Sequence, residues 1–466
     1  MDGNSKRQEC LRREALELRH QFAQGSRGVF AGILPVEDIV AVIEQECSQF
    51  RERLYPPLTT LRLFIEQVLS DDRACQDTVC RHLSERVARR KSASGLNTGA
   101  YCQARQRLPL SVSQRLYRIV GAALESKMPK AWRWRGRSVK LFDGTGVSMP
   151  DTEENQREFP QSSEQKPGLG FPQARICGLI SLASGAVLGH AIAASKGKGS
   201  GEQSLLLSEL LPLLETGDIL LADALLATWW VIAEAQAAGV DVVMPQHGCR
   251  ITDFTQGYPL GARDHVVAWP RPQRPAWMSI ERWEGYPAVL NVRECEVHGR
   301  TLVTTLLDSN AASPRELDAL YALRWNIEVD WRTIKATLKM DVLRCLSPEM
   351  VKKEIAVYLL AYNLVRWTMA TAAKLADLLP RALGFTGAKR VLLAFTEALR
   401  RSGKRRLQTL FAITLGAIAI MKLPVRPGRI EPRAKKRRPK PLPLLTVPRH
   451  IARANIIAAQ HAKGLS

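Results

Sequence analysis

Hydrophobic positions in the first part of the chain recur with the period of an α-helix, and no strand pattern interrupts them. The clearest periodic segments are residues 36–54 and 58–70, and residues 75–91 are a further helix candidate. A loop rich in Ser, Gly and Asn then leads into a short predicted helix at residues 98–108. Residues 1–135 are therefore predicted to form a helical domain.

From residue 136 the pattern changes to short apolar runs that alternate with helical periods. The predicted strands are residues 138–142, 174–182, 186–194, 218–222 and 240–244, and the predicted helices between them are residues 200–214 and 226–238. The spacing of Ser200 and Gln203 is that of a capping box at the start of the first of these helices. This order favours an α/β layer that begins with a hairpin across Ser184-Gly185.

Residues 247–312 depart from this alternation, because they hold further strand patterns and a turn at His298-Gly299. We interpret them as a β-rich insertion in the α/β domain. Two long helices are then predicted at residues 314–340 and 348–373.

The α/β domain is thus expected to span residues 136–375, and a helical C-terminal region is expected at residues 376–466. Within that region, residues 388–421 have a helical pattern, whereas residues 426–443 are basic and rich in proline. Proline and like charge oppose packing, so the sequence predicts a mobile tail that contacts phosphates.

One stretch of the predicted helix at residues 314–340 carries a single acid within a basic and aromatic face. The residues of this face, three or four positions apart, are Tyr321, Arg324, Glu328, Trp331 and Lys335. The residues of the predicted core side are Leu320, Leu323, Ile327, Ile334 and Leu338. Most charged helix faces are solvated surfaces. The Tyr and Trp beside the charges favour a chemical role instead.

The net charge of the chain indicates which class of partner it binds. The chain has 67 Lys and Arg against 45 Asp and Glu, a net charge of +22. Such a field attracts polyanions, so nucleic acid is the first candidate and a membrane surface the second. We identify no secretory leader, lipidation signal or basic anchor helix, so no membrane partner is expected. The nine cysteines lack the spacing of a zinc site, which favours reduced thiols in a cytoplasmic protein.

The short helix at residues 98–108 is a candidate for DNA recognition. It follows a helix and a loop, and it carries Gln103, Arg105 and Arg107. This arrangement is compatible with a helix inserted in a DNA groove. It is equally compatible with any basic helical bundle.

Two aspartates follow predicted strands of the α/β layer. Asp143 comes after the first strand, where Gly144 and Gly146 are expected to let the chain turn, and Asp223 comes after the fourth. Side chains at such strand ends face the site in open α/β sheets. Taken singly, an Asp before a Gly is more often a turn residue.

Glu328 supplies a third carboxylate from the helix. By itself it could simply pair with Arg324 or Arg332 on the same helix. Jointly, two strand-end carboxylates and one from a helix packed across them can hold two Mg²⁺ ions, because Mg²⁺ binds a few carboxylates together with water and substrate phosphates. The combination points to cleavage and transfer of phosphodiester bonds.

The spacing of Tyr321, Arg324, Glu328 and Lys335 also resembles the signature of the insertion-sequence-4 family of bacterial DDE transposases. The similarity continues through LFDGTGVSMPD, GDILLAD and DVLRCLSPEM and covers about residues 95–375. It implies a ribonuclease-H-like catalytic core with a β-rich insertion, preceded by a helical domain and followed by helices and a basic tail.

The same resemblance implies roles for individual residues. Asp143, Asp223 and Glu328 are expected to be catalytic and to bind Mg²⁺, for which Mn²⁺ can substitute. Tyr321, Arg324 and Lys335 are expected to hold DNA phosphates, a task that suits an Arg fork and a Lys charge. The further DNA contacts that we predict are Arg332, Arg105 and Arg107.

The implied function is transposition of double-stranded DNA. The protein would bind the terminal inverted repeats of its element, cut at the ends and join the 3′-hydroxyls to target DNA, as a homodimer associated with the nucleoid. In this family a Trp of the insertion stacks on a flipped base. Trp269, Trp277 and Trp283 are available for this, although a core or rim position is the alternative for each.

Two alternative functions remain. One is a catalytically inactive protein that represses transposition by occupying the ends, and the intact Asp143, Asp223 and Glu328 argue against it. The other is a different ribonuclease-H-like nuclease, which the helix signature and the large insertion argue against.

Overall fold

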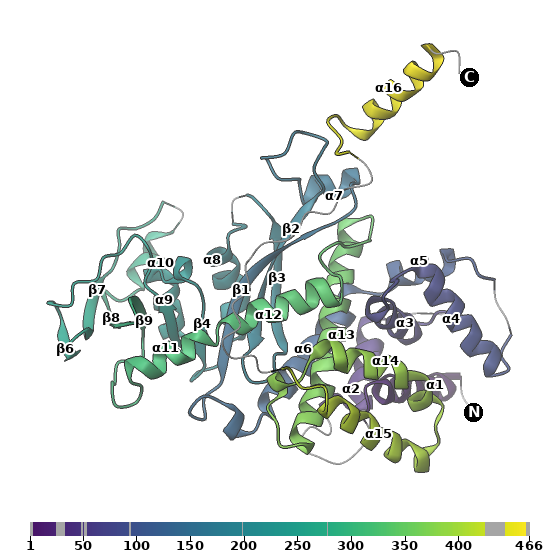
Figure 1. The fold of residues 1–466 in the computed structure, drawn as a ribbon, viewed down its shortest axis with the longest axis horizontal. Helices are drawn as coiled ribbons and strands as arrows, with labels where there is room; N and C mark the ends of the chain where they lie inside the picture. The colour runs from purple at the N-terminus through teal and green to yellow at the C-terminus, as the bar shows by residue number, and fades with distance from the viewer. Residues whose placement is uncertain are drawn as a thin grey trace.

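The computed structural model describes residues 3–24, 33–47, 50, 54–92, 95–197, 199–276, 278–424 and 443–462. Among these residues, nine strands form one sheet in the order β3-β2-β1-β4-β5-β9-β8-β7-β6. Helices cover the half of the sheet that contains β1, and beside it the N-terminal helices pack against helices of residues 348–419 (Figure 1).

The first half of the sheet forms the α/β layer. Its strands are β1 (Val139–Ser148), β2 (Gln173–Ser181), β3 (Val187–Ala194), β4 (Ile219–Leu221) and β5 (Asp241–Pro245). Strand β1 is antiparallel to β2 and parallel to β4, and β4 is parallel to β5. The predicted hairpin between β2 and β3 is confirmed. This mixed layer confirms the ribonuclease-H-like fold that the sequence predicts.

The predicted insertion extends the same sheet. Its elements are β6 (Tyr258–Gly261), β7 (Asp264–Pro270), α10 (Ile280–Glu284), β8 (Val289–Val297) and β9 (Arg300–Thr304). Strand β9 pairs antiparallel with β5, so the insertion continues the sheet away from β1. The turn between β8 and β9 has positive φ at His298 and Gly299, as a two-residue hairpin loop requires.

Several helices before β1 share one hydrophobic core with helices that follow the insertion, whereas the last helix, at residues 449–462, has no buried residue. The N-terminal helices are α1 (Gly3–Gln21), α2 (Val36–Glu46), α3 (Pro57–Leu69), α4 (Cys75–Ala88), α5 (Gly99–Arg107) and α6 (Leu110–Ser126). The later helices are α13 (Pro348–Leu375), α14 (Phe385–Arg401), α15 (Lys404–Ala419) and α16 (Arg449–Ala462). The core runs from α1 and α3 through α6 and α13 to α14 and α15.

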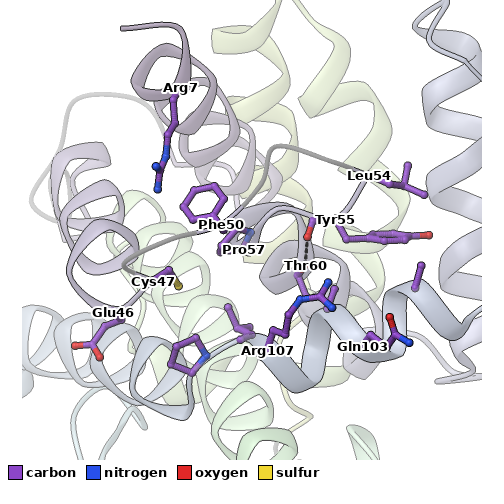
Figure 2. Close-up of a pocket in the computed structure, with 14 residues that line it drawn as sticks. Arg7, Glu46, Cys47, Phe50, Leu54, Tyr55, Pro57, Thr60, Gln103 and Arg107 are labelled. Carbon is purple, nitrogen blue, oxygen red and sulfur yellow. Dashed lines mark hydrogen bonds between the residues drawn. The ribbon is translucent and has the colours of Figure 1, made fainter. Parts of the chain in front are cut away.

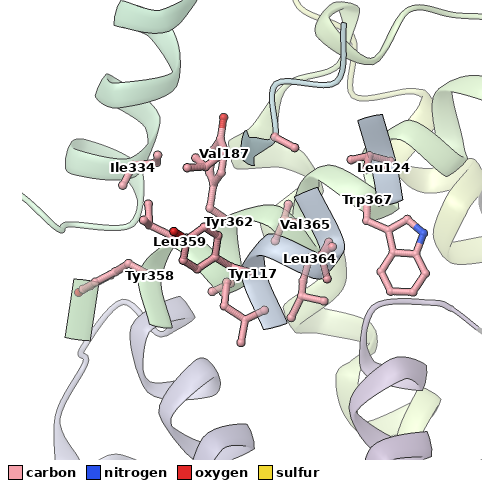
Figure 3. Packing of buried hydrophobic residues seen from close by; sticks show 14 of the residues in the cluster. Tyr117, Leu124, Val187, Ile334, Tyr358, Leu359, Tyr362, Leu364, Val365 and Trp367 are labelled. Atoms are coloured by element: carbon pink, nitrogen blue, oxygen red, sulfur yellow. The ribbon is translucent and has the colours of Figure 1, made fainter. Parts of the chain in front are cut away.

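Helix α13 is the centre of this core (Figure 3). Tyr362, Val365 and Trp367 are buried on it. The polar Asn363 within this apolar helix is satisfied, since it donates to the carbonyls of Tyr117 on α6 and Val187 on β3 and accepts from the Val187 amide. Helix α13 therefore ties the N-terminal helices to the sheet.

The prediction that the first strand ends at Asp143 was wrong. Strand β1 continues to Ser148, and Asp143 pairs with Gly178 of β2 in its middle. Gly144 and Gly146 do not turn the chain, because pairing with β2 keeps them extended. Only the parallel pairing with β4 stops early, at Leu141.

The predicted helix at residues 200–214 is shorter and irregular. Helix α8 (Glu202–Leu205) begins after Gly201, while the Ser200 hydroxyl donates to the Gly197 carbonyl, so the predicted capping box does not form. A π-helical turn and a 3-10 turn follow, consistent with Pro212, which lacks a backbone N–H to continue a helix. The next helix, α9 (Trp229–Ala237), begins with a Thr228 cap.

The long helix predicted at residues 314–340 is divided. It consists of α11 (Pro314–Ala322), α12 (Trp325–Arg332) and a π-helical turn at Thr333–Thr337. At the junction, the amides of Leu323 and Arg324 bond to carbonyls only three residues earlier. This tighter winding rotates the residues that follow, so the two faces read from a regular helix do not persist through it.

Three further predictions concern chemistry rather than fold. None of the helices that the structure describes is long and apolar enough to cross a membrane. No disulfide joins the cysteines in the described residues. The predicted basic tail lies outside the described residues, except for Pro443.

Candidate active site

The two predicted aspartates lie at the same edge of the sheet. The parallel pairing of β1 and β4 ends at Leu141 and Leu221, and Asp143 and Asp223 each follow two residues later. Beyond this point β1 keeps its pairing with β2, whereas the chain after β4 enters a 3-10 turn at Ala224–Leu226. The β4 side of β1 is therefore open at Asp143.

The sheet separates two hydrophobic clusters, and this determines where Asp143 points. Leu141 and Ile219 belong to the cluster that contains Ile327 of α12, whereas Phe142 belongs to the cluster under α8 and α9. Side chains alternate along a strand. Asp143 therefore faces α12, and position 144 faces α8.

Asp143 lies in an environment that disfavours its charge. Its Oδ1 accepts a hydrogen bond from the Gly144 amide at 2.8 Å, and its Oδ2 is 3.9 Å from Arg324 Nη1. Burial nevertheless raises the pKa of Asp143 to about 6, and the carboxylates of Glu202 and Asp223 add to the rise. The negative charge at this position is thus only partly compensated by the protein.

Asp223 is half-buried, and one of its oxygens lacks a protein partner. Its Oδ1 is inaccessible to solvent and makes no hydrogen bond within the part of the chain that the structure describes. A buried carboxylate oxygen without a partner is costly, so a cation or a donor brought by a ligand would satisfy it.

Glu328 faces the same region but is paired with an arginine. Its Oε1 accepts from Arg324 Nη2 at 2.9 Å, so the guanidinium of Arg324 lies between Glu328 and Asp143. Across the described ranges, no three His, Cys, Asp or Glu side chains are close enough to hold a metal ion. The fold brings Asp143 and Asp223 to one edge, and Arg324 contacts both Asp143 and Glu328.

Trp331 was predicted on the chemical face of the helix, and this was wrong. It is only 3% exposed, and a Cβ added at Gly178 would lie 2.5 Å from its ring. Since Gly178 pairs with Asp143, the missing side chain lets α12 approach the sheet next to that acid. Leu323, predicted on the core side, is 43% exposed.

Lys335 and Tyr321 have different environments. Lys335 Nζ donates to Thr145 Oγ1 at 3.1 Å, two residues beyond Asp143 on β1. Tyr321 is buried, and the guanidinium carbons of Arg300 and Arg324 are 5.4 and 5.9 Å from the centre of its ring. Lys335 and Arg324 therefore put two positive charges beside the acids.

The remaining predicted DNA contacts are Arg332, four residues after Glu328, and two arginines of α5. Arg332 is exposed on α12. Arg105 packs its guanidinium 4.8 Å from the centre of the Phe64 ring and donates to Gln67, so it is engaged within the helical domain. Arg107 is exposed at the end of α5. Whether these residues contact DNA stays a prediction.

Arg107 lines a large pocket in the N-terminal helices. The pocket has a volume of about 990 Å³, and Arg7 of α1 and Arg107 of α5 reach into it (Figure 2). Gln103, Tyr55 and Glu46 also line it. Its position in the helical domain separates it from the acids at β1 and β4.

The sequence reasoning missed Asp330, which lies two residues after Glu328. It is fully buried, and its carboxylate accepts from Arg366 Nη2 at 2.5 Å, Arg381 Nη2 at 2.9 Å and the Tyr362 hydroxyl at 2.9 Å. Arg381 also donates to the Ser181 carbonyl at the end of β2. This network anchors the back of α12 to α13 and the sheet. Two sequence features could have indicated this ion pair: Asp330 lies on the predicted core side of its helix, and Arg366 lies within a later apolar helix.

The tryptophans of the insertion have different environments. Trp269 is buried, donates to Glu294 and lies under the guanidinium of Arg250 at 3.6 Å. Trp283 is half-buried, with Arg271 at 3.8 Å from its ring centre. Trp277 lies outside the described residues. A core position is confirmed for Trp269.

Comparisons with known proteins agree with this geometry. Residues 134–364 match the family described as Transposase DDE domain. The chain is 28% identical over 356 residues to the transposase InsG for insertion sequence element IS4 of Escherichia coli strain K12, which covers 73% of this chain and 76% of that protein. A putative transposase InsL for insertion sequence element IS186A of the same strain is 34% identical over 113 residues, covering 23% and 30%.

Among solved structures, a piggyBac transposase synaptic complex with hairpin DNA has a TM-score of 0.42 and 8% identity, covering 86% of this chain and 85% of that chain. The matched DDE domain contains all three predicted acids, and the similarity to the IS4 transposase extends over most of the chain. Residues 134–364 therefore match a transposase DDE domain, and the chain is similar to the transposase of IS4 over most of its length.

Proposed function

We propose that this transposase binds the terminal inverted repeats of its own element, cleaves phosphodiester bonds at the ends and transfers the 3′-hydroxyls to target DNA. The observation that carries the proposal is the assembly around β1. Two acids lie at one sheet edge, and α12 and the turn after it bring a third acid and two basic side chains to the same place.

A divalent metal fits the acids at this edge. Asp143 is a carboxylate whose charge is poorly compensated, and Asp223 has a buried oxygen without a protein partner in the described residues. Oxygen ligands of this kind suit Mg²⁺, with Mn²⁺ as a substitute. Asp143, Asp223 and Glu328 would hold it, and bound metal would activate the attacking oxygen and stabilise the leaving one.

Arg324 and Lys335 are the residues that would hold the substrate. A DNA phosphate is a bidentate partner for a guanidinium, as the Glu328 carboxylate is. When a DNA phosphate reaches the site, Arg324 would bind the phosphate in place of Glu328. Glu328 would then be free to bind the metal. Lys335, beside Thr145, would fix the phosphate from the other side. Both charges would stabilise the negative charge that develops during cleavage.

The rest of the chain would supply DNA affinity. The net charge of +22 favours contact with phosphates in general, and exposed Arg107 and Gln103 on α5 would face the DNA ends. Two ends must be joined in one reaction, so we propose a homodimer in the DNA complex. Its place of action would be the cytoplasm, at the nucleoid.

The test is cleavage of a DNA fragment that carries the element's own ends, with and without Mg²⁺, by the wild type and Asp143→Ala. We expect metal-dependent nicks at the ends that the variant does not make, while its binding to the ends in EDTA is retained. Specific end binding with no cleavage under any divalent metal would overturn the proposal. That result would support the end-occupying repressor instead.

A further inference from the structure

A fourth carboxylate lies against β1 next to Asp143. A Cβ built on Gly144 would be 2.4 Å from Glu202 Oε1 and 2.7 Å from Glu202 Cδ. The Glu202 carboxylate thus occupies the space that any other residue at position 144 would fill. Gly in a strand interior often marks such a close approach. Gly144 thus lies in an extended strand and not in a turn, and a side chain at this position would displace the Glu202 carboxylate.

The fold explains how Glu202 reaches this position. It is the first residue of α8, which follows β3 and packs on the face of the sheet opposite α12. At Asp143 and Gly144 no strand flanks β1 on the β4 side, because that pairing stops at Leu141. The edge is therefore accessible from both faces. Glu202 comes to it from the α8 face, and Asp143 and Glu328 belong to the α12 face.

The charge of Glu202 is weakly compensated. Arg175 Nε, at 4.0 Å, is its partner, and both side chains keep about a third of their exposure, 33% for Arg175 and 29% for Glu202. Burial raises the pKa of Glu202, and Asp223 contributes to the rise. Asp330 differs, since it is fully buried and neutralised by two arginines. Glu202 is thus placed as a ligand would be and not as a structural anion.

We propose that Glu202 is a fourth carboxylate ligand at the divalent-metal site, which it would reach from the α8 face of β1, opposite Glu328. The inference rests on the proposed function, because it concerns the same metal. In this proposal, Glu202 reaches the site from one face of the sheet and Glu328 from the other, and Asp143 lies between them. Asp143, Asp223 and Glu202 would be available to a metal while Glu328 is still paired with Arg324.

Gly144→Ala tests the geometry without changing any charge. Its Cβ would displace the end of a flexible side chain, which is cheap for the fold, and the backbone amide that binds Asp143 is retained. Glu202→Gln tests the charge itself. Glu209→Gln is the matched control, because Glu209 lies on the same helical segment and is exposed.

The measurement is Mn²⁺ binding to the full-length protein on end DNA, followed by electron paramagnetic resonance, with Mg²⁺ dependence of cleavage as a second readout. We expect Glu202→Gln and Gly144→Ala each to weaken Mn²⁺ binding at least about tenfold and to raise the Mg²⁺ needed for cleavage similarly. Thermal unfolding and end binding in EDTA should match the wild type. Glu209→Gln should match it in every assay.

Asp143→Asn separates failure of this inference from failure of the proposed function. If Asp143→Asn abolishes Mn²⁺ binding while Glu202→Gln and Gly144→Ala bind it as the wild type does, Glu202 is not a ligand and the proposed metal site stands. If Asp143→Asn also binds Mn²⁺ normally, the metal lies elsewhere and both proposals are overturned. If Arg175→Gln weakens Mn²⁺ binding as much as Glu202→Gln does, the effect comes from loss of the Arg175–Glu202 ion pair, and Glu202 is not a ligand.

Discussion

The acids on the two sides of helix α12 differ in how fully their negative charge is compensated. On the back, Asp330 is fully buried and receives hydrogen bonds from two arginines and a tyrosine. On the front, Asp143 and Glu328 share the single guanidinium of Arg324, and Asp223 has an oxygen that no described residue satisfies. The two acids Asp330 and Glu328 are only two residues apart.

This difference separates a structural acid from acids available for a ligand. A buried charge is tolerated when partners compensate it, and it then fixes the elements it joins. Acids that lack compensation cost stability, and such groups concentrate at functional sites. The back of α12 holds the helix at one rotation, so the front can present Arg324 and Glu328 to β1.

The largest effect is a loss of stability, and we expect it from removing the ion pairs of Asp330 on the back of α12. Asp330→Asn would leave Arg366 and Arg381 without their counter-charge, and removing one partner of a buried pair costs about 3–5 kcal/mol. Denaturant unfolding should show this loss. Asp151→Asn, an exposed acid, is the control and should cost almost nothing. A stability loss below about 1 kcal/mol would mean that Asp330 is not the anchor.

The front of the helix should respond in activity and not in stability. Glu328→Gln keeps the size of the side chain and a hydrogen bond to Arg324 but removes a proposed ligand. Cleavage of end DNA should fall at least about a hundredfold, because a metal ligand acts on the reacting charges directly. Gel-shift binding in EDTA should be retained. Equal loss of binding and cleavage would assign Glu328 a structural role like that of Asp330.

Because the charge of Asp143 is only partly compensated, its removal is expected to stabilise the folded protein. Its pKa is about 6 in the folded protein against an ordinary value of 3.8. Between these values the folded state holds the proton more tightly, so the cost of the charge is complete above pH 6 and disappears below 3.8. In EDTA, Asp143→Asn should be more stable than the wild type by about 1–2 kcal/mol at pH 8.

The gain should shrink as the pH falls through 6 toward 4, measured by thermal unfolding of both proteins across that range. A gain that grew with falling pH would have the wrong sign for a raised carboxyl pKa. It would then come from a contact other than the buried charge.

The smallest effect concerns a single phosphate contact. Lys335→Gln removes one charge, so binding to end DNA should weaken a few-fold, and the slope of binding against salt should fall by about one. Fluorescence anisotropy at several salt concentrations measures both. Arg157→Gln, which removes an exposed charge paired with Glu153, should leave the slope unchanged. An unchanged slope in Lys335→Gln would exclude a phosphate contact.

Local patterns were enough for much of the architecture. Period-two and helical runs predict the β2–β3 hairpin, β4, β5 and the strands of the insertion, because a residue's neighbours in sequence set its secondary structure. Asp143 and Asp223 lie at one edge as predicted, because the parallel pairing of β1 and β4 stops two residues before each of them. The signature spacing placed Arg324 and Lys335 beside them.

The misses share one physical cause. Gly144 suggested a turn, but pairing with β2 keeps it extended, and Glu202 fills the space beside it. Trp331 had the spacing of the chemical face, but the bare surface at Gly178 and the tightened turn at Leu323 bury it. Each of these wrong predictions involves contact with an element distant in sequence, and a periodic pattern contains no information about such contacts.

By itself, the sequence determined most of the elements, the net charge and the spacing of the signature residues along the chain. Only the tertiary structure decided which acids are neutralised and which are left available. Asp330 finds Arg366 and Arg381 through the packing of α12 on α13, whereas Glu328 finds Arg324 on its own helix. The reason is that compensation of a charge depends on distance and burial, and both are set by how separate elements pack.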